Sequence, residues 1–159
     1  MGYGPGMKIK TTMPKVAPPG EVVDLDLVRA RMRTLARRQA DRMVEDLTKG
    51  LQSVARSAEE SYKAEGSVPE RFSSVKEDAD HIQFVAQDGP HSLVGDREIA
   101  EAQVDVADTP TPSGRDPETV VGAFEFGSAA LSVPATQFNR RAEQRQQEAQ
   151  EVWEGIVED

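Results

Sequence analysis

A stripe of apolar residues at helical spacing runs through the first third of the chain and constrains the fold more than any other feature. Its members step by three or four residues throughout, about 3.7 on average: Leu25, Val28, Met32, Ala36, Ala40, Met43, Leu47, Leu51, Val54, Ala58 and Tyr62. This spacing is typical of one face of an amphipathic helix. It predicts a helix from about Asp24, a good N-cap, to Ala64, interrupted only by Gly50.

A helix of this length spans roughly 60 Å at ~1.5 Å per residue, which is long for a chain of 159 residues. The pattern fits either a break near Gly50 or a rod that projects and packs against another subunit. The stripe alone does not show whether this face is buried within the chain or pairs with another helix in a coiled coil. Core packing is the more frequent use of such a face.

Shorter patterns follow this helix and predict a small sheet. Gly66 ends the helix, and a polar connection then reaches Asp80. Two antiparallel strands are expected, at 81–86 and 100–106, separated by about twelve residues. The sequence Asp-Gly-Pro at 88–90 is a turn signal within that connection.

The rest of the chain divides into an arm, a loop, an apolar run and a helix. Four prolines and four glycines make 1–23 an extended arm, a kind of segment that often orders only against a partner. The proline-rich stretch 108–118 is expected to be a mobile surface loop, and 120–127 is the most apolar short run. An amphipathic helix is expected over 134–158. The fold class is α+β, with one domain over 24–159.

The charge is divided unevenly along the chain. The total of -9 is the sum of +4 over residues 1–63 (12 basic, 8 acidic) and -13 over 64–159 (7 basic, 20 acidic). Six basic residues fall in one stretch of the long helix, opposed there only by Asp41: Arg29, Arg31, Arg33, Arg37, Arg38 and Arg42. Such a helix can bind phosphate through counterion release. A solvated face, or a face that meets the acidic half of a neighbouring copy, is favoured here because DNA repels an acidic chain at a distance.

Composition argues against several classes of protein. With no cysteine and two histidines, the chain has no disulfide framework, no thiol nucleophile and no usual zinc ligand set. Hydrophobic residues make up 37% of the chain and only eight residues are aromatic, which predicts a thin core. No apolar run is long enough for a membrane span or a secretion signal. These features fit an intracellular, non-redox protein.

No arrangement of residues predicts an enzyme, a cofactor or a metal site. His81 and His91 have no acidic neighbour at ligand spacing, and the serines near residue 130 lack a nucleophile elbow. The acidic group 77–80 is most simply a solvated turn. Trp153 lies on the apolar side of the last helix, where an anchor in the core or between subunits is the favoured use.

Glu125 is out of place between Phe124 and Phe126, because a buried carboxylate must be hydrogen-bonded or paired. Two interpretations are open. Glu125 points outward from an alternating strand, or it forms a structural ion pair with Arg140 or Arg141.

The chain resembles a family of tailed-bacteriophage proteins at its C-terminal third. The residues that carry the resemblance are Ala123-Phe124-Glu125-Phe126-Gly127-Ser128, then Pro134-Ala135, then Phe138-Asn139-Arg140-Arg141-Ala142. They are similar to the ending of the small tail-completion or head-tail joining proteins, which also begin with a long amphipathic helix followed by strands. The chain departs from that family at 68–72, where the family has an Asp-Thr-Gly segment, and at 137–142, which lacks the family's prolines.

This resemblance implies a structural virion protein of the neck, made in the host cytoplasm. It would form a sixfold or twelvefold ring around the DNA channel, between the head connector or stopper and the tail terminator or tail tube. DNA would pass nearby without sequence-specific binding, and no membrane is involved. A tail terminator or connector stopper is a close alternative. A nucleic-acid-binding or scaffolding protein that acts through 29–42 is an alternative of another class.

Overall fold

The computed structural model describes residues 7–12, 25–94 and 97–158, and their side chains over 30–89 and 101–148. The elements are β1 (Met7–Thr12), α1 (Leu25–Glu65), α2 (Glu70–Ala79), β2 (Phe84–Val94), β3 (Arg97–Val106), α3 (Pro117–Phe126) and α4 (Phe138–Glu158). The α+β class with a long first helix, an antiparallel sheet and a last helix is confirmed. The predicted arm lies outside the described residues except for β1, which is a strand of the sheet.

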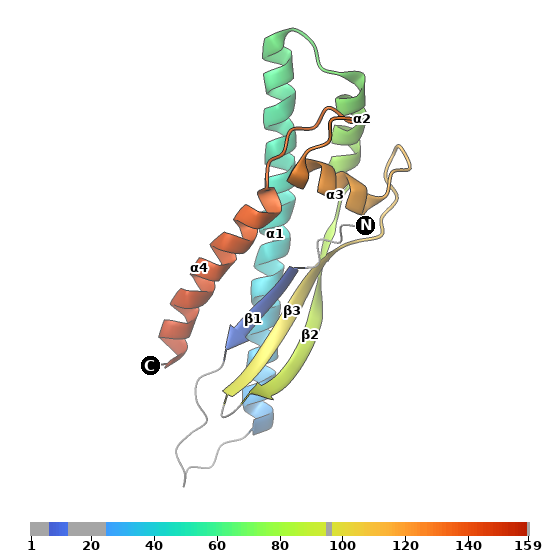
Figure 1. Cartoon of the computed structure of the whole chain (residues 1–159). Coiled ribbons are helices and arrows are strands. Elements are labelled where there is room, and N and C mark those ends of the chain that lie inside the picture. Colours follow the sequence, from blue (N-terminus) through green and yellow to red (C-terminus); the bar gives the residue numbers. More distant parts are fainter. Residues whose placement is uncertain (1–6, 13–24, 95–96, 159) are drawn as a thin grey trace.

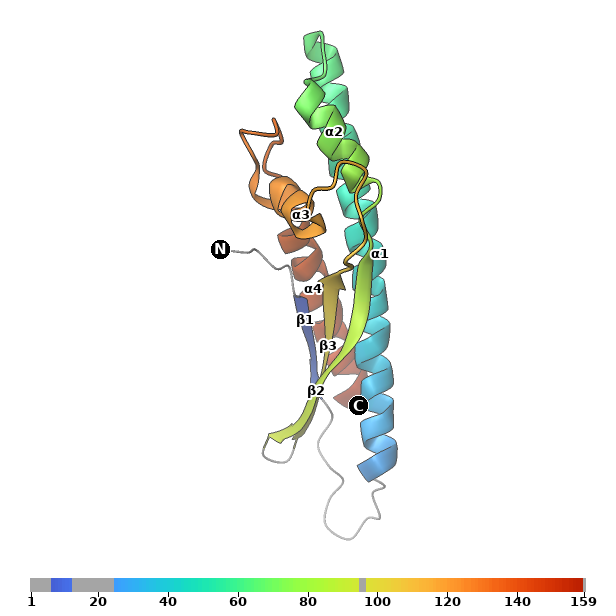
Figure 2. The ribbon, with the colours of Figure 1, turned by 90° about the vertical axis from the view of Figure 1, so that its right-hand side faces the viewer.

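Helix α1 is the spine on which the other elements pack (Figure 1). The sheet covers one part of it, α2 runs beside its C-terminal part, and α4 starts beside its middle and slants away from it (Figures 1 and 2). The predicted stripe is buried from Met32 to Ala58 except at Val54, which is half-buried beside the buried Ala55, and Gly50 does not interrupt the helix. A Cβ at Gly50 would lie 3.7 Å from Phe138 Cδ2, so α4 packs over this position at ordinary contact distance.

The sheet has the order β1-β3-β2, and both pairings are antiparallel. Ala86, Ala102 and Val104 form its buried face. The predicted turn at 88–90 is wrong, because these residues lie within β2 at a bulge between Asp88 and His91. A Gly-Pro pair fits an edge strand at a bulge, where proline's missing N–H costs no ladder bond. The predicted separation of about twelve residues is wrong too, since only 95–96 lie between the two strands.

Helix α2 replaces the polar connection expected after Gly66, and that expectation is wrong. Three apolar residues at helical spacing anchor it: Phe72, Val75 and Ala79 are all buried. The Phe72 ring packs against Tyr62 of α1 and Phe124 of α3, with centroids 5.2 and 6.2 Å away. Too few apolar residues carry this pattern for it to stand out in the sequence.

The apolar run 120–127 forms α3 rather than a strand. Asp116 is the N-cap, and its side chain accepts a hydrogen bond from the N–H of Glu118, while Pro117 occupies the first turn. The last helix begins at Phe138, four residues later than predicted.

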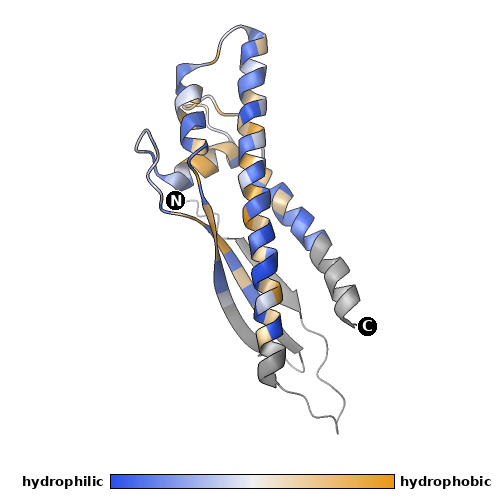
Figure 3. Cartoon of the chain, turned by 180° about the vertical axis from the view of Figure 1, so that it is seen from behind, coloured by the Kyte–Doolittle hydropathy of each residue, from blue (hydrophilic) through white to orange (hydrophobic). Residues whose placement is uncertain are grey.

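The back of α1 remains uncovered. Figure 3 shows α1 in front of the other elements when the molecule is seen from behind, with a mostly hydrophilic outward face. All buried hydrophobic residues of the described part form one cluster, which α1 lines along most of its length. The helix is therefore packed within the chain on one face only.

Two glycine substitutions test this packing. A Cβ at Gly89 would lie 2.4 Å from the carbonyl oxygen of Glu101, so Gly89→Ala must displace β2 from β3. We expect a loss of about 2 kcal/mol or more in the free energy of unfolding. Gly50→Ala should instead stabilise α1 by about 0.5–1 kcal/mol, because the methyl group fits. Urea unfolding measures both changes, and equal effects would contradict the described packing.

Candidate functional site

The residues of the phage-like motif come together at the junction of α3 and α4. Phe124, Phe138 and Ala142 are buried in the core, whereas Phe126 is 60% exposed and Arg140 is exposed. The motif residues are therefore divided between core and surface.

The connection between the two helices is held by backbone contacts to α3. The N–H and hydroxyl of Thr136 both donate to the Phe124 carbonyl oxygen, at 2.9 and 2.6 Å. Gly127 has a φ of 84°, and a Cβ there would lie 3.0 Å from the N of Ala135, next to Pro134. The sequence Gly-Ser at 127–128 thus makes a close turn that only glycine fits well.

Glu125 joins α3 to the N-terminus of α4, and both earlier interpretations of it are wrong. Its side chain is 2% exposed, so it does not point outward. Its carboxylate accepts hydrogen bonds from the backbone N–H groups of Asn139, at 2.9 Å, and Arg140, at 3.4 Å. The hydrogen-bond partner is therefore the first turn of α4, and Arg141 acts on the carboxylate through its charge without a direct ion pair. Free N–H groups at a helix N-terminus favour a carboxylate there.

Burial raises the pKa of Glu125, although the two backbone hydrogen bonds and the charge of Arg141 oppose this effect and the carboxylate of Glu143 adds to it. A raised folded-state pKa means that the folded protein binds this proton more tightly than the unfolded chain. The contribution of Glu125 titration to stability is therefore fully present below the ordinary glutamate pKa and is lost as pH rises through the folded value. A pKa raised by burial is also found at catalytic acids, but here the carboxylate is occupied by backbone donors.

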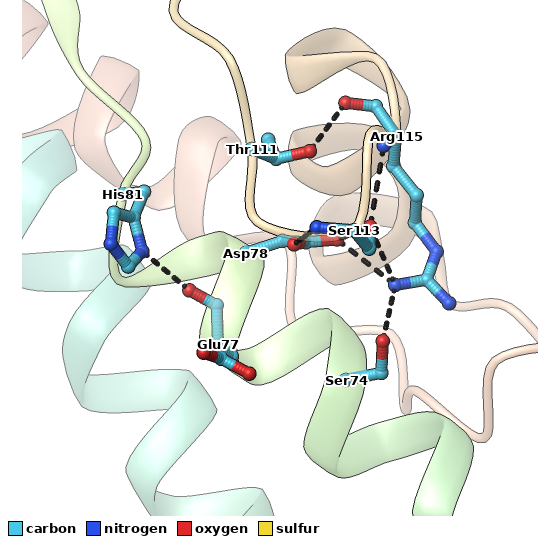
Figure 4. Close-up of polar contacts among 7 residues, drawn as sticks. All are labelled: Ser74, Glu77, Asp78, His81, Thr111, Ser113 and Arg115. Carbon is cyan, nitrogen blue, oxygen red and sulfur yellow. Dashed lines mark hydrogen bonds and ion pairs between the residues drawn. The ribbon is translucent and has the colours of Figure 1, made fainter.

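A second buried carboxylate, Asp78 of α2, organises the loop between β3 and α3 (Figure 4). It is fully buried, so its part in a predicted solvated turn is wrong. Ser113 donates to it twice, through its hydroxyl and through its backbone N–H at 3.0 Å. The guanidinium of Arg115 donates to Asp78 and to the hydroxyl of Ser74, both at 2.9 Å. Asp78 thus forms one cluster with Ser113 and Arg115, which follow it in the sequence by 35 and 37 positions.

These contacts fix the protonation state of Asp78. Burial by itself raises the pKa of Asp78, but the hydrogen bonds from Ser113 and the hydrogen bond and charge of Arg115 together lower it below its ordinary value. Such a carboxylate is a poor proton acceptor for the Ser113 hydroxyl. His81 lies nearby, and its Nδ1 is 2.9 Å from the Glu77 carbonyl oxygen (Figure 4). The cluster is suited to holding the loop. These contacts argue against the predicted mobility of 108–118, which stays untested.

The loop presents negative charge to solvent. Asp108, Asp116 and Glu118 are exposed, while Arg115, the only cation of 108–118, is turned in toward Asp78. Its side chain is 26% exposed. We call the three carboxylates of Asp108, Asp116 and Glu118 the acidic loop surface.

A groove of about 320 Å³ lies between α1 and α4 and carries positive charge. Lys49, Arg141 and Arg145 line it together with Gly50, Ser53, Val54 and Phe138. Asp46 holds the Arg145 guanidinium through two hydrogen bonds, at 2.7 and 3.0 Å, and Glu45 holds Lys49 at 2.7 Å. Among the described residues, Arg141 has no side-chain hydrogen bond or ion pair. We call these residues the basic groove.

The arginines predicted as one basic stretch do not share one face. The described ones are all exposed: Arg31, Arg33, Arg37, Arg38 and Arg42. Arg37 faces the sheet, with its guanidinium 3.3 Å from Asp88 of β2 and 3.6 Å from Asp41. Arg31 and Arg38 line a hollow on α1 with Leu35. Arg29 and Trp153 lie outside the residues whose side chains are described.

Sequence reasoning missed both the Asp78 cluster and the basic groove. The one available signal for Asp78 was its place beside the apolar positions of α2, three residues after Val75. The groove depends on how α4 crosses α1, which no local pattern reveals. Within the described part of the chain, no three acidic or histidine side chains are placed to hold a metal ion.

The chain was compared with known proteins in three ways, and no family model, curated protein or solved structure matches it. None of the described helices is long and apolar enough to cross a membrane. The candidate sites therefore rest on their own geometry.

Asp78→Asn tests the role of the cluster. Removing one partner of a buried ion pair should lower the free energy of unfolding by about 3 kcal/mol at pH 7. Because the folded pKa of Asp78 is lowered, its stabilisation is present above about pH 4 and is lost as pH falls through the folded value. The difference between wild type and variant should therefore shrink in acid. Asp80→Asn, an exposed neighbour, should cost less than about 1 kcal/mol, and equal losses in the two variants would argue against the cluster.

Glu125→Ala tests the junction of α3 and α4. It leaves a buried N–H of α4 without its acceptor, so we expect a loss of about 2 kcal/mol in the free energy of unfolding. The exposed Glu148→Ala on α4 is the control for loss of a glutamate and should change stability by less than about 0.5 kcal/mol. Chemical denaturation at pH 7 compares the two, and an unchanged stability of Glu125→Ala would refute the capping role.

Proposed function

We propose that this chain is a non-enzymatic structural subunit of the neck of a tailed phage. It belongs to the tail-completion or head-tail joining class, and several copies act around the DNA channel. They connect the head connector to the tail terminator or tail tube. The tail terminator or connector stopper is a close variant that differs in position within the neck.

One observation carries this proposal, the placement of opposite charges on opposite sides of α1. The basic groove lies on the α4 side, and the acidic loop surface lies on the side of the loop between β3 and α3 (Figures 1 and 2). Two different complementary surfaces on one chain allow head-to-tail contacts, and such contacts generate rings when the rotation closes. This supports a subunit that works in several copies.

The organisation of the phage-like motif also supports a structural role. Phe124, Glu125 and Phe138 are buried, and the Glu125 carboxylate is occupied by backbone donors of α4. The order of long helix, sheet and last helix is the one that the resemblance implies. These residues hold two helices together, a role for which no substrate is needed.

Duplex DNA binding through α1 remains the alternative of another class. The exposed Arg31 and Arg38 favour it, while Arg37 is already paired with two carboxylates. A gel shift separates the two readings, because tight and salt-sensitive binding by the isolated chain would favour the alternative.

Deleting the gene from the phage genome that carries it tests the proposal. We expect DNA-filled heads and complete tails that do not join, visible by negative-stain electron microscopy. Wild-type particles should contain several copies of the chain per virion by quantitative mass spectrometry. Normally joined particles after deletion, or absence of the chain from virions, would refute the proposal.

A further inference from the structure

The basic groove has the features of a binding site for a carboxylate-bearing segment. Its cations come from two helices, and Val54 and Phe138 add apolar lining. Lys49 and Arg145 are each paired with an acidic neighbour on α1, at 2.7 Å, so their charges are partly balanced within the chain. Arg141 makes no side-chain hydrogen bond or ion pair with a described residue, although its charge acts on the buried Glu125 carboxylate, and it is the groove cation without a paired acidic neighbour on α1.

The acidic loop surface is the complementary feature of the same chain. Glu118 and Asp108 are exposed and make no side-chain hydrogen bond or ion pair with any described residue. The Asp78 cluster holds the loop and keeps Arg115 away from the surface carboxylates. A held loop loses less conformational entropy on binding than a flexible one.

The two surfaces lie at different places on the molecule. In Figure 1, α4 lies on one side of α1 and the loop between β3 and α3 lies on the other, and Figure 2 places that loop nearest the viewer. The acidic loop surface of one chain therefore cannot occupy its own groove. It is free to reach the groove of another copy without a change in fold.

We propose that the basic groove of one copy binds the acidic loop surface of the next, with Glu118 or Asp108 pairing with Arg141. This inference rests on the proposed function, since it names the contact by which copies assemble. A second copy is a better occupant than nucleic acid because it supplies the matching charge, whereas a chain of charge -9 is repelled by DNA.

Charge reversal of each partner tests the contact in the full-length chain. Arg141→Glu and Glu118→Arg should each weaken self-association at least tenfold, because each places like charges opposite each other. Analytical ultracentrifugation at about 50 mM salt measures the association, which should also weaken as salt is raised toward 1 M. Both side chains are exposed, but the charge of Arg141 also acts on buried Glu125, so circular dichroism checks that Arg141→Glu keeps the fold, and Glu118→Arg tests the contact independently.

Matched controls carry the same charge changes on α1, away from the groove and from the loop. Arg56→Glu and Glu60→Arg alter exposed residues that do not line the groove or belong to the loop, and they should leave self-association within about twofold of wild type. They separate a specific contact from an effect of net charge.

The double variant Arg141→Glu with Glu118→Arg gives the decisive result. It restores opposite charges across the contact, so association should return to within about threefold of wild type. An equimolar mixture of the two single variants should associate better than either alone. Failure of both to recover overturns the proposed contact.

Other outcomes distinguish this inference from the proposed function. Wild-type assembly that is unaffected by Arg141→Glu overturns the contact and leaves a ring built by another surface. A wild-type chain that stays monomeric at about 100 μM overturns the contact, while the gene-deletion result still decides the neck function independently. Loss of duplex DNA binding by Arg141→Glu, without any change in self-association, would assign the groove to phosphate instead and overturn the proposal.

Discussion

Burial of one face of α1 is the interaction on which the rest of the fold depends. Leu47 and Leu51 are almost fully buried, and truncation of such a side chain typically costs about 2–5 kcal/mol. The exposed ion pair between Arg37 and Asp88, which also links α1 to the sheet, is worth at most about 1 kcal/mol. Apolar packing therefore decides where the sheet, α2 and α4 lie, and surface charges adjust to that placement.

Two buried carboxylates then add polar contacts that tie the loop after β3 and the start of α4 to neighbouring helices. Asp78 ties the loop after β3 to α2, and Glu125 ties the start of α4 to α3. In each case the backbone N–H groups of an irregular segment or helix end need an acceptor, and a carboxylate supplies it. The loops are thus positioned by a few strong polar contacts, and the helices by many weak apolar ones.

The element predicted most accurately from the sequence is the one whose apolar residues keep a helical spacing over many turns. Eleven apolar positions defined α1, so its bounds were accurate to one residue at each end. Helix α2 has only three such positions, and α3 is so uniformly apolar that its period cannot be read. Asp-Gly-Pro at 88–90 is compatible with a turn and with a bulge in an edge strand, so the sequence alone does not distinguish the two. The pairing of Asp78 with Arg115 and the crossing of α1 by α4 depend on tertiary structure, which no local pattern contains.

The pairing of Asp78 with Arg115 is not explained by stability alone. Replacing a buried ion pair by apolar residues of similar volume is often neutral or stabilising, because both charges must lose their water. What the pair does in this chain is position a loop and remove the only cation of 108–118 from its surface. The carboxylates of Asp108, Asp116 and Glu118 remain exposed, and that of Asp116 also caps α3. In the proposed contact between copies, this arrangement would link the core of α2 to the assembly of the chain.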